Sequence, residues 1–201
     1  MNVLVKTVSS ETVIKGSRFI AEVFPCTTQA EARELLKKQK SEYSDATHVC
    51  HAFVLGKNAE ILGMSDDGEP SGTAGRPMLD VLKGSQCTNI MLTVTRYFGG
   101  TLLGTGGLVK AYGGCAKSVL EEALHENAIE PLVEKSSFLL TVSYSFYDEL
   151  KRLLENFHIY EIAEDFQTEI TIKGKIRADE CMSLSEKIFD SSGGKIKVSI
   201  T

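Results

Sequence analysis

Two loops in the middle of the chain carry the side chains with the clearest capacity for chemistry. The first, residues 66–75 (DDGEPSGTAG), holds three carboxylates within four positions, and we call it the acidic loop. Carboxylates at this density can bind a metal ion, act as general bases or pair with a Lys or Arg of a partner. They can equally cap turns and helix ends, because Asp-Gly is a common turn pair. Capping, recognition and catalysis all remain open here for Asp66, Asp67, Glu69, Ser71 and Arg76.

The second loop, residues 96–107 (RYFGGTLLGTGG), follows a strand-like run at 89–97 and precedes a helical pattern at 108–127; we call it the glycine loop. A helix that starts beneath a glycine-rich loop offers free N–H groups and the positive end of a dipole, which suits an anion. Thr105 is the expected N-cap. The alternative is that the glycines only let the strand and the helix pack closely. The candidate binding residues are Arg96, Tyr97, Gly99, Gly100, Gly104, Thr105, Gly106, Gly107 and Lys110.

Two nucleotide-binding motifs are incomplete in the glycine loop. Gly99 and Gly104 have the spacing of a phosphate loop, but Thr-Gly follows where Lys-Ser/Thr is required. Gly104 and Gly106 begin a dinucleotide fingerprint that needs a third glycine where Val109 stands. The sequence therefore predicts no cofactor.

Both loops should leave one sheet. Met64 ends one predicted strand and Arg96 ends another, so two parallel, neighbouring strands would bring the loops together at one edge. We then expect the three carboxylates to face Arg76, Arg96 and Lys110, with Arg96 and Lys110 holding a phosphate or carboxylate. The predicted elements of this half are strands at 3–14, 17–25, 46–55, 59–64 and 89–97, and helices at 28–43, 77–84 and 108–127.

The cysteines and histidines give no metal motif. His48 and Cys50 lie on one face of the predicted strand at 46–55, but no second ligand pair has fitting spacing. We expect His48 to form hydrogen bonds near the glycine-rich loops and Cys50 to pack in the core. The five cysteines form an odd set without paired spacing, which predicts reduced thiols and neither a metal nor a disulfide.

A linker is predicted at residues 130–135, which are charged and contain Pro131. It divides the chain into domains at 1–132 and 136–201. After the linker, the apolar spacing follows the order strand, helix, strand, strand, helix, strand. That βαββαβ order is typical of a ferredoxin-like domain and makes the fold class α+β.

Charge and hydropathy exclude several classes of protein. The net charge is −5, and the two predicted domains carry about −2 and −3. Nucleic-acid-binding proteins usually have a basic excess, so strong non-specific binding of RNA or DNA is not expected. The sequence has no run of 18 apolar residues, so no membrane span is predicted, and the N-terminus lacks the form of a signal peptide. We expect a cytoplasmic protein that does not associate with membranes.

Five short segments in this order resemble the YigZ/IMPACT family: KGSRFI, ATHVC, SDDGEPSGTAGRPML, TRYFGG and LGTGGLVKAYG. The resemblance implies an N-terminal domain like the second domain of a small-subunit ribosomal protein and a C-terminal ferredoxin-like domain. It also implies a link to translation, because eukaryotic relatives regulate translation through a kinase-activator partner, whereas bacterial members have no agreed activity. His51 departs from the family pattern, in which an aromatic residue is expected.

The leading hypothesis is a translation-associated binding or regulatory protein that contacts RNA, the ribosome or a translation-regulatory partner through the glycine-rich loops. A small hydrolase that uses Asp66, Asp67 and Glu69 is an alternative, but no Ser/His/Asp, zinc or cysteine-base arrangement supports an enzyme. A pure protein-interaction scaffold is the third. The sequence does not determine the oligomeric state.

Overall fold

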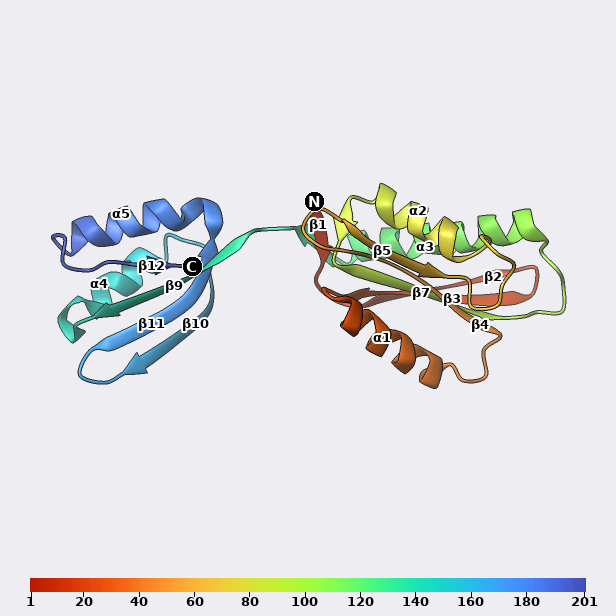
Figure 1. The fold of residues 1–201 in the computed structure, drawn as a ribbon, viewed down its shortest axis with the longest axis horizontal. Helices are drawn as coiled ribbons and strands as arrows, with labels where there is room; N and C mark the ends of the chain where they lie inside the picture. Colours follow the sequence, from red (N-terminus) through yellow and green to blue (C-terminus); the bar gives the residue numbers. More distant parts are fainter. The chain divides into compact units, whose positions relative to one another are not determined.

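A computed structural model describes all residues, 1–201, and the chain forms two compact units (Figure 1). The N-terminal unit comprises Met1–Leu132 and the C-terminal unit Val133–Thr201. Each unit has its own hydrophobic core.

The N-terminal unit is built on a five-stranded sheet in which every pair of neighbouring strands is antiparallel. The central strand β7 reads IMLTVTRY, and its β-branched and apolar residues are buried along almost their whole length, as a covered central strand requires. In spatial order the strands are β2 (Val8–Ile14), β3 (Ser17–Pro25), β7 (Ile90–Tyr97), β4 (His48–Leu55) and β5 (Ile61–Ser65).

The strand predicted at 3–14 is in fact two strands in two sheets. Its first part, β1 (Asn2–Leu4), pairs with β6 (Cys87–Thr88) and β8 (Ile129–Pro131) in a separate three-stranded sheet. Apolar alternation continues across the division, so periodicity alone cannot show that the hydrogen-bond partners change. The pairing of β1 with β8 joins the start of the N-terminal unit to its end.

Helices cover both faces of the five-stranded sheet (Figure 1). One face carries α2 (Gly75–Gly84) and α3 (Thr105–His125), and α3 buries residues at helical spacing in the main core. The other face carries α1 (Gln29–Glu42) over a smaller apolar cluster. Thr28 caps α1 by accepting a hydrogen bond from the N–H of Glu31.

The C-terminal unit has the predicted βαββαβ order, and the prediction of an α+β fold with a ferredoxin-like C-terminal domain is confirmed. Its four-stranded antiparallel sheet has the order β10-β11-β9-β12, and a short 3-10 turn, η1 (Ala178–Glu180), precedes the last helix. The turn between the second and third strands of this unit lies at residues 167–169. The other elements are β9 (Lys135–Val142), α4 (Tyr144–Leu154), β10 (Ile159–Phe166), β11 (Ile170–Arg177), α5 (Cys181–Ser191) and β12 (Ser199–Ile200).

Candidate functional site

The acidic loop and the glycine loop meet at one edge of the five-stranded sheet. Their parent strands β5 and β7 are parallel to each other but are not neighbours, because β4 lies between them and is antiparallel to both. The first residue of β4, His48, is paired in register with Arg96 of β7. The strands are thus parallel but not adjacent, and the start of β4 becomes the third contributor to the site.

A pocket of about 430 Å³ lies between the two loops and the start of α3. Its walls are mostly apolar, and two large side chains of the glycine loop remain exposed there: Phe98 at 46% and Leu102 at 82%. The backbone N–H of Phe98 donates to the hydroxyl of Thr47, which fixes the loop to the residue before β4. The lining residues are Thr47, His48, Gly68, Glu69, Pro70, Arg96, Phe98, Leu102, Leu103, Gly104, Thr105 and Leu108.

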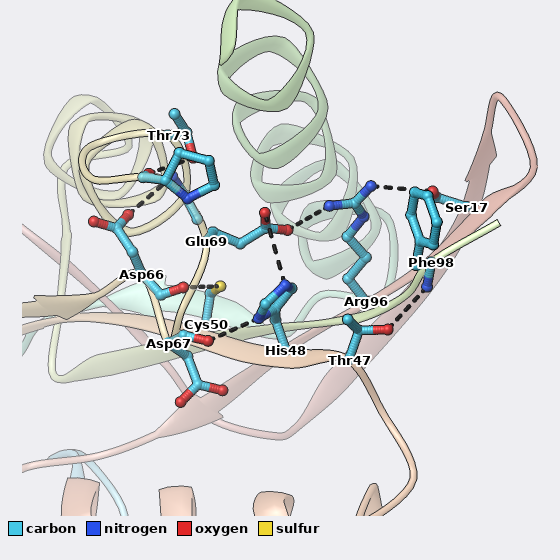
Figure 2. Close-up of polar contacts among 12 residues, drawn as sticks. Ser17, Thr47, His48, Cys50, Asp66, Asp67, Glu69, Thr73, Arg96 and Phe98 are labelled. Carbon is cyan, nitrogen blue, oxygen red and sulfur yellow. Dashed lines mark hydrogen bonds and ion pairs between the residues drawn. The ribbon is translucent and has the colours of Figure 1, made fainter. Parts of the chain in front are cut away.

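A buried ion pair, drawn in Figure 2, is formed by two of the residues that line the pocket. Nη1 of Arg96 lies 2.7 Å from Oε1 of Glu69, and both side chains are more than nine-tenths buried. Nη2 of Arg96 donates to the hydroxyl of Ser17, and the hydroxyl of Tyr112 donates to Oε1 of Glu69 at 2.7 Å. Burial raises the pKa of Tyr112, and the adjacent carboxylate raises it further, so Tyr112 remains a donor. These partners hold the carboxylate in one position.

His48 stands beside that carboxylate with its tautomer set by the acidic loop. Nδ1 of His48 lies 2.8 Å from the backbone oxygen of Asp67, and a carbonyl oxygen can only accept, so Nδ1 carries the hydrogen. Nε2 lies 3.9 Å from Oε2 of Glu69 (Figure 2). His48 and Glu69 both line the pocket, so an N–H or O–H group of a ligand there can contact either side chain. The prediction that His48 bonds near the glycine-rich loops is confirmed.

Asp66 caps α2 rather than facing a ligand. Its carboxylate accepts hydrogen bonds from the backbone N–H groups of Gly72, Ala74 and Gly75 at 2.8, 3.0 and 2.8 Å. Burial raises the pKa of Asp66, but the three backbone hydrogen bonds lower it by more, so the net pKa is below its ordinary value. The ionised carboxylate also lies at the positive end of the α2 dipole.

Asp67 ties the acidic loop to the sheet and to α1. One carboxylate oxygen accepts from the backbone N–H of Val49 at 2.7 Å, and the other pairs with the amine of Lys40. Burial raises the pKa of Asp67, and the contacts with Lys40 and Val49 lower it by more, leaving it below its ordinary value. The capping alternative therefore describes Asp66, whereas Asp67 anchors the loop.

Of the expected face-to-face charges, only Glu69 and Arg96 meet. Arg76 instead pairs with Asp80 one helical turn along α2, at 2.9 Å. Lys110 is exposed on α3, and Ser71 is exposed on the acidic loop; neither lines the pocket. The charged cluster expected from the sequence is therefore a single neutralised pair.

The glycine loop combines close packing with an open helix start. A Cβ on Gly99 would lie 1.9 Å from the backbone of Gly16, so only glycine allows this approach, whereas Gly100 needs glycine for its φ of +84°. The expectation for Thr105 is wrong: Gly104, at φ +72°, occupies the N-cap position, and Thr105 is the first residue of α3. No side chain caps this end, so the first N–H groups of α3, at Thr105 and beyond, have no capping partner.

The remaining candidates do not line the pocket. Tyr97 is half-buried and donates to Asp45 at 3.0 Å, while Gly106 and Gly107 form the first turn of α3. Sequence reasoning missed Phe98, Leu102 and Tyr112. Phe98, Leu102 and Leu103 are large apolar residues among the glycines and threonines of residues 98–107. That contrast could have identified Phe98 and Leu102 as candidate binding residues from the sequence.

Two further observations concern other kinds of site. No three His, Cys, Asp or Glu side chains are grouped so that they could hold a metal ion, and all five cysteines are free. Every helix is either too short or too polar to cross a membrane.

Known proteins are similar to this chain over nearly its whole length. Residues 15–120 match the Impact N-terminal domain. An IMPACT family member of Haemophilus influenzae is 38% identical over 94% of this chain and 91% of its own length, and IMPACT family member YigZ of Escherichia coli is 37% identical over 92% and 90%. A crystal structure of a hypothetical protein is 34% identical, with a TM-score of 0.69 over 98% of this chain and 95% of that one. The matched domain includes both loops of the pocket, and the chain belongs to the IMPACT family.

Proposed function

We propose that this protein regulates translation by binding, and that the pocket between the acidic and glycine loops receives a segment of a protein partner. The regulatory role is supported by family membership, because the family resemblance implies regulation of translation for its eukaryotic members. Translation takes place in the cytoplasm, so we place this activity there. The proposal of a protein partner is supported by the pocket itself.

The exposed apolar rim carries the proposal. Phe98 and Leu102 are large, exposed side chains beside a mostly apolar pocket, and such residues at a concave site are typical of protein contacts. The uncapped start of α3 lies at the same site and can receive a carbonyl or carboxylate oxygen. A peptide segment with one apolar side chain provides both kinds of group.

The charges at the pocket favour a protein over RNA or the ribosome as the partner of these loops. Arg96 is committed to Glu69, and Lys110 lies outside the pocket, so no unpaired Lys or Arg lines it. RNA binding depends on cations that neutralise phosphates. The hydrolase alternative is weaker as well, because Asp66 and Asp67 are engaged in capping and loop anchoring.

The proposal is tested by affinity purification from extracts of cells that naturally make the protein, with and without RNase. The wild type is compared with Leu102→Asp, in the glycine loop, and with a matched control, Leu124→Asp, which changes an exposed leucine near the C-terminal end of α3 and outside the pocket. We expect translation proteins that resist RNase, are lost with Leu102→Asp and are retained with Leu124→Asp. Equal recovery by both variants, or loss of every partner after RNase treatment, would contradict the proposal.

A further inference from the structure

The sheet of the C-terminal unit has one face covered by helices and one face that its helices leave open. Leu150 and Leu154 of α4 and Leu184 and Ile188 of α5 pack in one core with the inward residues of the strands. Side chains alternate along a strand, so the residues between those inward positions lie on the other face. On the two central strands the open face carries Lys135, Ser137, Leu139 and Thr141 of β9, and Thr171, Lys173, Lys175 and Arg177 of β11.

Four cations are concentrated on this open face. Lys135 and Arg177 are directly opposite each other in the β9–β11 pairing, and Lys173, Lys175 and Arg177 occupy alternate positions of β11. Like charges directly opposite on a sheet are destabilising. Residues 133–201 contain 9 basic and 12 acidic residues, so a general basic excess does not explain this arrangement. Two of the four, Lys135 and Lys173, form no ion pair with an acid, so this face can receive a ligand of opposite charge.

The acids near these cations do not prevent such a ligand from binding. Glu161 pairs with Lys175, and Asp179 pairs with Arg177 at 2.7 Å, but the side chains of both acids are more than 60% exposed. Exposed ion pairs contribute little free energy and exchange readily with solvent or another anion. Asp165 lies farther along the same face, opposite Thr171. The amine of Lys135 lies over the ring of Tyr160, 3.9 Å from its center, and Lys173 forms no ion pair.

We propose that this open face binds the phosphate backbone of a single-stranded nucleic acid. A strand rises by about 3.3 Å per residue, so the three cations of β11 form an extended row that successive phosphates of an extended strand can follow. The 39%-exposed Leu139 lies among the cations and offers an apolar surface for a base, and the Tyr160 ring offers a second surface once the Lys135 amine leaves it to contact a phosphate. An acidic peptide would pair with the cations of this face but has no bases to stack on Leu139 and Tyr160. The inference concerns the other unit and does not depend on the pocket.

The test is fluorescence anisotropy of the full chain with a labelled single-stranded RNA of mixed sequence, titrated at several salt concentrations. A DNA of the same sequence and a poly-glutamate of the same length are run in parallel. The test variant is the double change Lys135→Gln and Lys173→Gln, which leaves both exposed ion pairs intact. The matched control is Lys151→Gln and Lys187→Gln: these lysines also lie over aromatic rings but belong to α4 and α5.

We expect the test variant to weaken RNA binding at low salt by about tenfold or more, and to lower the slope of log affinity against log salt by about two. The control should change affinity by less than about twofold. The melting temperature of the test variant should not fall, because Lys135→Gln removes a like-charge opposition. If RNA binds more tightly than DNA, the natural ligand of this face is RNA. Equal affinities for RNA and DNA would support a contact with the phosphate backbone that both nucleic acids share.

Three results would overturn the inference. The first is the absence of RNA binding by the wild type at low salt. The second is an equal loss of affinity in the test variant and in the control, which would show that only the total charge matters. The third is poly-glutamate binding as tight as RNA binding with the same loss in the test variant, which would assign the face to an acidic protein.

Discussion

Arg96 and Glu69 join the two loops through an ion pair of 2.7 Å whose side chains are 6% and 3% exposed. Arg96 is the penultimate residue of β7, and Glu69 belongs to the acidic loop, 27 positions earlier in the sequence. A charge removed from water is costly unless a partner of opposite charge remains beside it. The position of each loop therefore depends on the residue that the other provides.

The first prediction concerns this pair. Arg96→Met should lower the free energy of unfolding by about 3–5 kcal/mol, because it leaves the Glu69 carboxylate buried without its cation. Urea unfolding measures the change. Adding Glu69→Gln to that variant should recover part of the loss, because the buried charge is then absent.

A matched change at an exposed pair provides the control. Arg76→Met removes the partner of Asp80 on the surface of α2, where more than half of each side chain is exposed. Its cost should stay within about 1 kcal/mol. If Arg96→Met costs no more than Arg76→Met, the buried pair does not hold the loops in place.

The second prediction is the pH dependence of the Asp66 cap. Its pKa in the folded protein is below the ordinary value of 3.8, so folding favours the ionised form. The stability that it contributes is therefore fully present above pH 3.8 and is lost as the pH falls through the lowered pKa. Asp66→Asn should cost about 1–2 kcal/mol at neutral pH and less in acid.

Urea unfolding of wild type and Asp66→Asn, at neutral pH and near pH 3, measures this difference. Glu121→Gln, a carboxylate-to-amide change at an exposed position of α3, is the control and should show little difference at either pH. A cost for Asp66→Asn that stays the same or grows in acid would contradict the role of the ionised cap.

Much of the fold was predictable because it follows from periodicity and local signals. The helix at 28–43 and the βαββαβ order of the last third come from apolar spacing and from the cap at Thr28, and the structure has both. The division of the first strand was not predictable, because β1 is set by pairing with residues of β6 and β8 that are distant in sequence.

The site was predictable in location but not in detail. The density of glycines between Ser65 and Gly114 identified both loops, which do meet. The partners of individual charges depend on strand order, and β4 lies between β5 and β7. Arg96 thus reaches Glu69, whereas Arg76 and Lys110 point elsewhere on the surface of their helices.

The third prediction concerns the thiols. Burial raises the pKa of Cys50 to about 12, and Cys50 is fully buried, whereas Cys181 is half-buried. A maleimide at neutral pH should therefore label Cys181 well before Cys50. The thiolate is the reactive form, and the reagent cannot reach a thiol that is buried in the core. Peptide mass spectrometry follows the order, and all five thiols should react after denaturation. Early labelling of Cys50, or fewer than five thiols under reducing conditions, would contradict this account.

The fourth prediction is that the two units fold separately. In residues 1–132 the first strand, β1, pairs with the last strand, β8, so the unit is complete within this range. Residues 133–201 contain a separate apolar core. Each fragment, expressed alone, should show a cooperative thermal transition by circular dichroism. A broad, non-cooperative melt for both fragments would show that the boundary is wrong. The C-terminal fragment starts at 133 because Lys135 at the start of β9 pairs with Arg177.

The most direct test of the pocket as a partner site is site-specific photocrosslinking in living cells. A photoreactive benzoylphenylalanine replaces Leu102, which is 82% exposed at the pocket, and in a second strain it replaces Leu124, which is 59% exposed near the C-terminal end of α3. Both positions are open, so the substitution should leave the fold intact. We predict a light-dependent covalent adduct with a protein of the translation system from position 102 and none from position 124. No adduct from position 102, or the same adducts from both positions, would contradict the central claim.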